Sequence, residues 1–436
     1  MALGLLCIKQ TNRYKGEVLL NITRKFTFIL SIAALVTNAH VHAKANSKSA
    51  LNRYSSIMSS PYVTWGIRHD NDKSINVVPA WKLLKVKKTI TVGVVDTGID
   101  PHHPLVSKNI THPKTEQGVR RPTSSAFGVD FSKGSEDKFA PFDQNGHGTH
   151  IAGIIKSVFP DVKMLALKYY NPQATGYENL VSTLAALKYA VDSNVDIINY
   201  SGGGPEPSID EFRILKKAEE KGILVVAAAG NNRSNIDVKR NAYYPASYNL
   251  NNIITVTAYD PNMNILPSSN FGAKKVHIAA PGHKIASALP MGRYGYLTGT
   301  SQATAFVSGV AAMMKSMFPE LTPQEIKKLI LGSAKPERQF QGKCVTAGRL
   351  DAGAALKAVI LERGTEQEQN STIAKKKRAR HLASTKKIKK TSKGRIIMIN
   401  GETKVVRKKS KKFRDTLFKS SSTTKKVKPG KIIYRL

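Results

Sequence analysis

The stretch Thr89–Asp96 reads TITVGVVD. It is continuously apolar and rich in β-branched residues until its last residue, an aspartate. Such a run is typical of a strand that is buried on both faces, because a half-exposed strand would alternate with polar residues. We therefore predict a strand inside a parallel sheet, with Asp96 at its carboxyl end. In parallel α/β folds, functional sites form outside that end of the strands.

Strand-like and helix-like segments alternate on either side of this run, from about residue 90 to 358. Further strand-like runs occur at 162–170, 195–200, 223–229 and 253–258. Capping boxes at Ser208–Glu211 and Thr322–Glu325 each predict the start of a helix. This alternation predicts an α/β fold of three layers, a mostly parallel sheet with helices on both faces.

Three short blocks carry residue types suited to nucleophilic catalysis: DTGID at 96–100, NGHGTHIAG at 145–153 and GTSQAT at 299–304. A serine hydroxyl attacks a carbonyl only with an imidazole base beside it and a carboxylate that fixes the imidazole. Taken singly, the blocks also fit an Asx-turn, a loop histidine and a helix cap. Together, in this order along the chain, they predict a triad of Asp96, His147 and Ser301.

On these motifs, residues from about 81 to 358 resemble the subtilisin-like (subtilase) serine endopeptidases. The resemblance implies a subtilisin-like fold and hydrolysis of peptide bonds through an acyl-enzyme. The segment AAAGNN at 227–232 is similar to the one whose asparagine completes the family's oxyanion hole. It implies that role for Asn231, with an ordinary turn residue as the alternative.

The resemblance also implies a surface for the substrate backbone. Ser201, Gly202 and Gly203, followed by Gly204, resemble the family's segment that pairs with substrate by β-augmentation. A flexible loop is the alternative. Tyr243 falls where the family shapes its main specificity pocket. Either it shortens that pocket and favours small side chains, or it points to solvent.

The chain departs from the family pattern in ways that bear on ligands. The segment from Gly153 to Val158 is short where many relatives bind a structural calcium, so we expect no calcium there. No cluster of cysteine and histidine has zinc spacing, and we expect neither a metal nor a cofactor. The serine motif continues with Gln302 in place of the usual methionine. His150, despite its place in the motif, is expected to pack below the site.

The N-terminus is typical of an export signal. Arg24 and Lys25 precede an apolar run, 26–36, and a small residue, Ala43, stands at the expected cleavage point. We predict a signal peptide at 1–43, a short extension at 44–75 and the peptidase domain at 76–361. The protein is then secreted, periplasmic or extracellular, without a transmembrane segment after cleavage. A buried hydrophobic helix is the alternative for the apolar run.

The segment 362–436 is a Lys/Arg-rich tail. The chain carries a formal net charge of +38, and residues 371–436 hold 24 basic and 2 acidic residues. Like charges repel, so we predict a largely disordered tail with a small hairpin at 395–406 around Asn400-Gly401. An exported tail of this charge favours an anionic polymer or envelope surface as partner, and no specific partner is the alternative.

Two functions of different classes follow. The first is an active, monomeric serine endopeptidase that acts on protein or peptide substrates. The second is a catalytically silent subtilase-like scaffold whose cationic tail binds anionic polymers. The intact set of Asp96, His147, Ser301 and Asn231 favours the first, because degenerate scaffolds usually lose a member of such a set.

Overall fold

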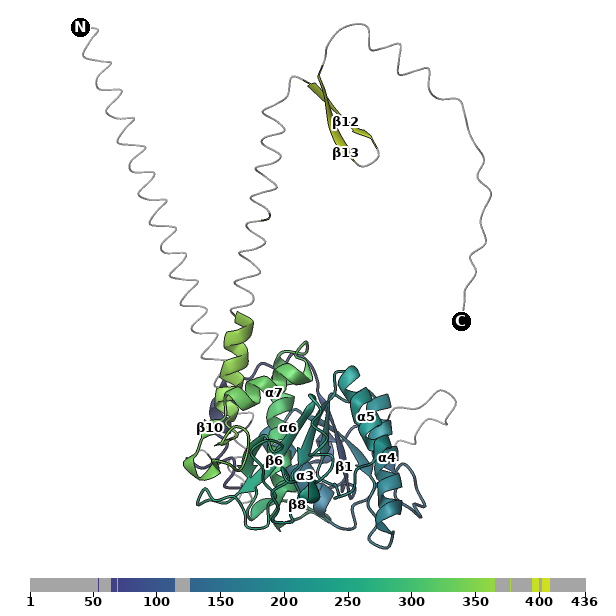
Figure 1. Ribbon diagram of the computed structural model, residues 1–436. Helices are drawn as coiled ribbons and strands as arrows, with labels where there is room; N and C mark the ends of the chain where they lie inside the picture. The colour runs from purple at the N-terminus through teal and green to yellow at the C-terminus, as the bar shows by residue number, and fades with distance from the viewer. Residues whose placement is uncertain are drawn as a thin grey trace, which may run out of the picture. The chain divides into compact units, whose positions relative to one another are not determined.

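A computed structural model describes residues 64–113 except 69, residues 126–364, the single residues Tyr54 and Lys377, and the backbone of 394–399 and 402–407 (Figure 1). The chain divides into two compact units, Met1–Glu362 and Arg363–Leu436. The predicted signal peptide, 1–43, lies outside the described residues. So do most of the predicted extension and most of the predicted tail.

A nine-stranded sheet forms the centre of the first unit, in the order β10-β11-β7-β6-β5-β4-β1-β3-β2. All neighbouring strands are parallel except β10, which runs antiparallel to β11. The prediction of a mostly parallel sheet is therefore confirmed. The strands are β1 (Thr91–Asp96), β2 (Gly128–Asp130), β3 (Lys163–Lys168), β4 (Ile197–Tyr200), β5 (Leu224–Ala228), β6 (Ile253–Tyr259), β7 (Ile278–Pro281), β10 (Lys335–Pro336) and β11 (Gly348–Arg349). A separate antiparallel hairpin joins β8 (Ile285–Leu289) to β9 (Arg293–Leu297).

Helices cover both faces of the sheet, which confirms the three-layer prediction. On one face α6 packs across β4 to β7, and α3 packs against β1 and α6. On the other face α4 and α5 pack together, against β1 and β5. The helices are α2 (Val77–Leu83), α3 (His147–Val158), α4 (Gly176–Asp192), α5 (Ile209–Glu220), α6 (Thr300–Met317) and α7 (Pro323–Gly332), and residues 352–364 are also helical.

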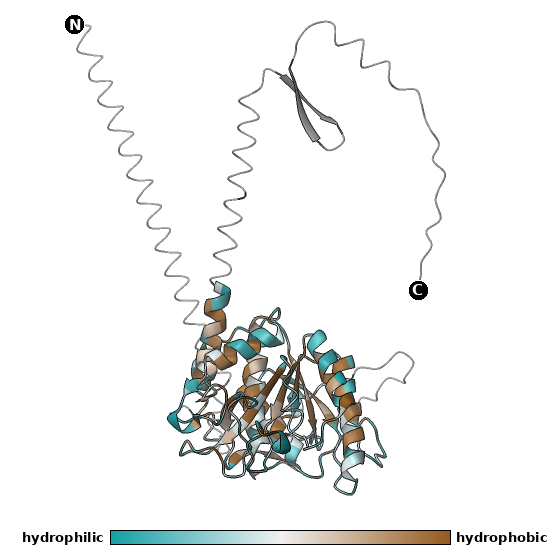
Figure 2. Ribbon diagram, in the orientation of Figure 1, coloured by the Kyte–Doolittle hydropathy of each residue, from teal (hydrophilic) through white to brown (hydrophobic). Residues whose placement is uncertain are grey.

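Successive residues of β1 supply the two hydrophobic cores. Val94 belongs to the cluster that contains Phe306 of α6, whereas Val95 belongs to the cluster that contains Leu187 of α4 and Leu215 of α5. Side chains alternate across a strand, so a central strand with a layer on each side must be apolar at every position. Figure 2 shows the resulting concentration of hydrophobic residues on the central strands. The run TITVGVVD is explained by this double burial.

The strand order reverses beside β1. After β1 the chain adds β2 and β3 on one side, and it then returns to place β4 to β7 on the other side. A crevice opens where the order reverses, at the carboxyl ends of the strands. Asp96 is the last residue of β1, and Ser201 directly follows β4. The topology therefore brings two of the predicted site segments to one edge of the sheet.

The two predicted capping boxes have different outcomes. At α7 both halves form, since Thr322 Oγ1 accepts from the Glu325 amide (3.2 Å) and Glu325 Oε2 accepts from the Thr322 amide (2.7 Å). At α5 only the first half forms, with Ser208 Oγ accepting from the Glu211 amide (3.3 Å). The predicted second half is wrong. The Glu211 carboxyl is buried and accepts instead from the Tyr200 hydroxyl (2.8 Å), which needs an acceptor inside the protein.

The second unit is described through two strands, β12 (Gly394–Ile399) and β13 (Glu402–Arg407). They pair antiparallel, with Ile399 opposite Glu402. These strands lie where the small hairpin, 395–406, is predicted. The turn residues Asn400 and Gly401 lie outside the described residues.

Candidate active site

An aspartate and a histidine meet where β1 ends and α3 begins. His147 is the first residue of α3, and its Nδ1 lies 2.7 Å from Asp96 Oδ1. The Asp96 carboxylate also accepts a hydrogen bond from the Thr97 amide (2.8 Å). Its side chain is 3% exposed, against 29% for His147. The carboxylate is thus buried and held in one orientation, while the imidazole reaches the surface.

A second carboxylate, Asp143, supports the first turn of α3, and sequence reasoning missed it. Asp143 Oδ1 accepts from the Gly146 amide (2.8 Å) and the Thr97 hydroxyl (2.8 Å). Its Oδ2 accepts from the Thr149 amide (2.8 Å) and hydroxyl (2.6 Å). Gly146 has no side chain with which to cap the helix, so Asp143 satisfies those free amides. An acidic residue four positions before His147 was the available signal.

The pKa of His147 is raised above its ordinary value of 6.5 by these carboxylates. Burial by itself would lower the pKa, because it disfavours the charged imidazolium. The charge and the hydrogen bond of Asp96 outweigh burial, and the charge of Asp143 adds to them. The surroundings of His147 are therefore arranged to accept a proton.

Asn231 lies on the loop after β5, and contacts with Thr300, the first residue of α6, orient its side-chain amide. Its Oδ1 accepts from the Thr300 amide (3.0 Å) and from the Thr300 hydroxyl (3.2 Å). Because the backbone N–H of Thr300 can only donate, the atom facing it must be the amide oxygen. The Nδ2 amino group of Asn231 therefore faces away from Thr300, as a donor for another group.

Ser301 is the second residue of α6, beside Asn231 and the segment after β4. Its side chain is largely buried, and its Oγ donates to the Ser201 carbonyl (3.1 Å). Within the described residues, no hydrogen bond joins Ser301 to His147. The structure thus pairs two members of the predicted triad directly and places the third against Ser201.

Comparisons with known proteins show the family of this chain. Residues 87–372, most of the chain, match the model of the subtilase family. This chain belongs to the subtilase family. It is 34% identical over 255 residues to the major intracellular serine protease of Bacillus subtilis, covering 56% of this chain and 74% of that protein. Over 255 residues it is 32% identical to subtilisin DY of Bacillus licheniformis, covering 56% of this chain and 83% of that protein. The chain is a serine endopeptidase.

The segment after β4 of this subtilase lies beside Ser301, whose hydroxyl donates to the Ser201 carbonyl. Ser201, Gly202 and Gly203 lie outside any strand, and Gly204 forms an isolated antiparallel bridge with Tyr244. The bridge uses the Gly204 amide and carbonyl, at 3.0 and 2.8 Å. The backbone before it is free of the central sheet, so a peptide could pair with it.

His150 of this subtilase lies one turn after His147 and has a different environment. It is fully buried, and its Nε2 lies 2.9 Å from the Ile285 carbonyl and 3.3 Å from that of Gly295. Burial lowers its pKa to about 4. His150 ties α3 to the hairpin of β8 and β9, which is the packing role expected of it.

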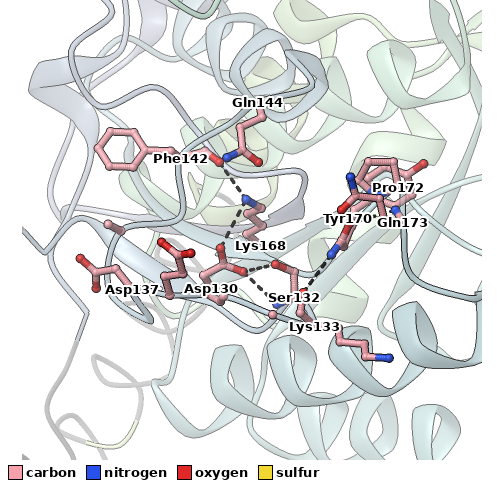
Figure 3. A pocket seen from close by; sticks show the side chains of 15 residues that line it. Asp130, Ser132, Lys133, Asp137, Phe142, Gln144, Lys168, Tyr170, Pro172 and Gln173 are labelled. Carbon is pink, nitrogen blue, oxygen red and sulfur yellow. Dashed lines mark hydrogen bonds and ion pairs between the residues drawn. The ribbon is translucent and has the colours of Figure 1, made fainter.

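A polar cavity of about 450 Å³ is lined by Lys168 and, among others, by Phe142 and Gln144, which precede His147 in the chain (Figure 3). Lys168, at the end of β3, is nearly buried there. Its Nζ lies 3.3 Å from Asp130 Oδ2 and donates to the Phe142 carbonyl (3.0 Å). A buried lysine thus ties strand β2 to the residue before Asp143. It supplies the positive charge that a buried carboxylate needs.

Within residues 64–113 and 126–364, no helix is long and apolar enough to cross a membrane. The same part of the chain holds no group of three or more His, Cys, Asp or Glu side chains placed to bind a metal ion. Helix α3 continues without interruption through residues 153–158, the segment that is short compared with relatives that bind a structural calcium there.

Proposed function

We propose that this subtilase hydrolyses peptide bonds with Ser301 as nucleophile, His147 as general base and acid, and Asp96 as the orienting carboxylate. Asn231 stabilises the oxyanion in this proposal, and Ser201, Gly202 and Gly203 bind the substrate backbone. The contact that carries the proposal is the 2.7 Å approach of His147 Nδ1 to the buried Asp96.

That contact determines the tautomer of His147. An ionised carboxylate can only accept, so the proton between the two residues belongs to Nδ1. Nε2 of the neutral ring then carries the lone pair and faces the crevice as the base. Asp96 also stabilises the imidazolium that forms during the reaction.

Ser301 begins the reaction by exchanging its hydrogen-bond acceptor. Its hydroxyl now donates to the Ser201 carbonyl. Rotation about the Cα–Cβ bond brings the hydroxyl toward His147 Nε2, and catalytic hydrogen bonds often tighten only with substrate present. The release of the Ser201 carbonyl also leaves an acceptor for a substrate N–H. Substrate binding and activation of the nucleophile are therefore linked.

The bond changes then proceed in two stages. The Ser301 oxygen attacks the scissile carbonyl while its proton passes to His147 Nε2, and that proton is then given to the leaving amine as the C–N bond breaks. Water attacks the resulting ester by the same route and regenerates the serine. In both stages the carbonyl oxygen becomes negative and accepts from Asn231 Nδ2 and the Ser301 amide. One such donor contributes roughly 3–4 kcal/mol to transition-state stabilisation.

A fluorophosphonate probe tests the nucleophile. It forms a phosphorus–oxygen bond to an activated serine and expels fluoride, so it should label the wild-type chain at Ser301. Ser301→Ala should abolish both labelling and cleavage of casein. Ser135→Ala, at an exposed serine of another loop, is the matched control and should label normally. A folded wild-type chain that neither labels nor cleaves would support the silent scaffold instead.

We also propose export and an anionic partner for the tail. The apolar run 26–36 and the charge of 371–436 support these proposals. A secreted protein should begin near residue 44 when its N-terminus is determined by mass spectrometry. Removal of 371–436 should spare labelling but lower the salt concentration that elutes the protein from heparin, because fewer counterions are released. Unchanged elution would contradict this role of the tail.

A further inference from the structure

Two glycines enclose the ring of Tyr243. A Cβ atom placed on Gly203 would lie 2.6 Å from Tyr243 Cε1. One placed on Gly230 would lie 3.0 Å from both Tyr243 Cδ1 and Cδ2, which sets Gly230 over the midline of the ring. A side chain on Gly203 would therefore collide with the ring, and one on Gly230 would press tightly against it. The phenol ring therefore fills the space between the two backbone segments.

These segments are the two walls beside the proposed nucleophile. Gly203 belongs to the segment 201–204, which holds Ser301 through the 3.1 Å contact to Ser201. Gly230 directly precedes Asn231, which is bound to the start of α6. A scissile carbonyl that reaches both Ser301 and Asn231 must lie at the mouth of the space between these walls. The side chain on its amino-terminal side, called P1, points between them.

The backbone holds Tyr243 in this place. Its amide donates to Ser247 Oγ (3.1 Å), and its carbonyl accepts from the Ser247 amide (2.8 Å). The next residue, Tyr244, forms the two-hydrogen-bond bridge to Gly204. The ring also packs on the buried cluster that contains Ala229. Tyr243 is half-buried, and its ring lies against Gly203 and Gly230 instead of turning fully to solvent.

We propose that Tyr243 closes the P1 pocket and restricts this subtilase to bonds that follow glycine or alanine. This inference rests on the proposed function, because it places the scissile carbonyl between Ser301 and Asn231. A Gly or Ala side chain ends before it meets the ring. Leucine or phenylalanine would have to displace the ring of Tyr243, which Gly230 approaches closely on one side.

The test uses internally quenched peptides that differ only at P1, which is Gly, Ala, Leu or Phe. For the wild-type chain, kcat/KM with Ala should exceed that with Phe by at least about 10- to 200-fold, because an apolar pocket already gives that discrimination for one methylene group and Phe adds a whole ring. Tyr243→Gly should raise kcat/KM for Phe by about tenfold or more and lower the Ala/Phe ratio. Tyr243→Phe is the matched control. It keeps the ring, so the order of substrates should persist.

Several outcomes would overturn the inference. A wild-type chain that cleaves after Leu or Phe as fast as after Ala contradicts it, and this result needs no variant. So does a folded Tyr243→Gly chain that labels with fluorophosphonate but keeps the wild-type ratio. If Tyr243→Gly fails to fold, Tyr243→Ala replaces it. Absence of both labelling and cleavage in the wild type would instead overturn the proposed function, and this inference with it.

Discussion

Two histidines lie one turn apart on α3, and their surroundings give them opposite chemistry. His147 faces the carboxyl end of β1, where Asp96 and Asp143 raise its pKa above 6.5. His150 faces the hairpin of β8 and β9, where burial lowers its pKa to about 4. The residue type and the helix are shared, so the difference is due to the neighbouring elements. Carboxylate neighbours favour the protonated form of one imidazole, while burial keeps the other neutral.

The largest expected difference between the two histidines is in catalysis. His147→Ala should lower kcat by on the order of 10⁶-fold, because the members of a triad act as one unit. His150→Gln should stay within about tenfold of the wild type, since Gln keeps a donor for the Ile285 carbonyl and the residue touches no substrate. The measurement is steady-state hydrolysis of an alanine peptide at 25 °C, with circular dichroism to confirm folding. Comparable losses in both folded variants would contradict the assignment.

The buried ion pair of Lys168 and Asp130, near the loop that precedes His147, can be removed without changing His150. Lys168→Met should cost about 3–5 kcal/mol of unfolding free energy, because it leaves the buried Asp130 carboxylate without its cation. It also removes the hydrogen bond to Phe142, next to Asp143. Urea denaturation measures the loss. Lys133→Met, at an exposed lysine nearby, is the control and should change stability by less than about 1 kcal/mol. Equal effects of the two changes would refute the buried pair as a support.

Acid should reveal the buried histidine through stability. His150 stays neutral when folded until the pH reaches about 4, whereas an unfolded histidine protonates near 6.5. The unfolded state therefore binds more protons below pH 6.5, and the free energy of unfolding falls as the pH drops toward 4. The contribution of His150 is about 3 kcal/mol.

His277 adds to this acid sensitivity, because burial lowers its pKa to about 3. His150→Gln should therefore flatten the dependence of stability on pH between 6.5 and 4 without abolishing it. Denaturant unfolding at several pH values measures the slope. An unchanged slope in His150→Gln would show that the pKa of His150 is the same in the folded and unfolded protein, which contradicts its lowering by burial.

The smallest expected effect is a shift in the pH profile of catalysis. Activity needs the neutral form of His147, so kcat/KM should rise with pH through a pKa above 6.5. Asp143→Asn removes one negative charge near His147 and should move that rise to lower pH. A rise that stays at the wild-type pH in a folded Asp143→Asn chain would exclude an electrostatic role for Asp143 and leave it a helix cap.

Much of the fold was predictable because it depends on local patterns. A strand with a layer of helices on each side is apolar throughout, and the apolar run TITVGVVD therefore indicates such a strand. Helix α7 begins where Thr322 and Glu325 predict it, since both partners of the cap lie within one turn. At α5 the same pattern was only half right. The Glu211 carboxyl accepts a hydrogen bond from the Tyr200 hydroxyl instead, and this contact lies outside the four residues of the capping pattern.

The site divides along the same line. The sequence by itself determined the three motifs and the candidate residues Asp96, His147, Ser301 and Asn231, because each motif is read within a few residues. The tertiary structure decided how these residues face one another. It turned the Asn231 amide by its contact with Thr300, 69 residues away, and it brought Asp143 to Thr97, 46 residues away.

Tyr243 shows the same division most clearly. Its sequence position allowed either a closed pocket or a ring in solvent, because nothing within its own segment distinguishes the two. Gly203 and Gly230, on loops after separate strands, leave a space that the ring fills. The orientation of a side chain depends on the volume that distant segments leave for it, and the packing of the sheet sets that volume. The sequence therefore determined the candidate reactive residues, while the packing decided how Tyr243 lies beside Gly203 and Gly230.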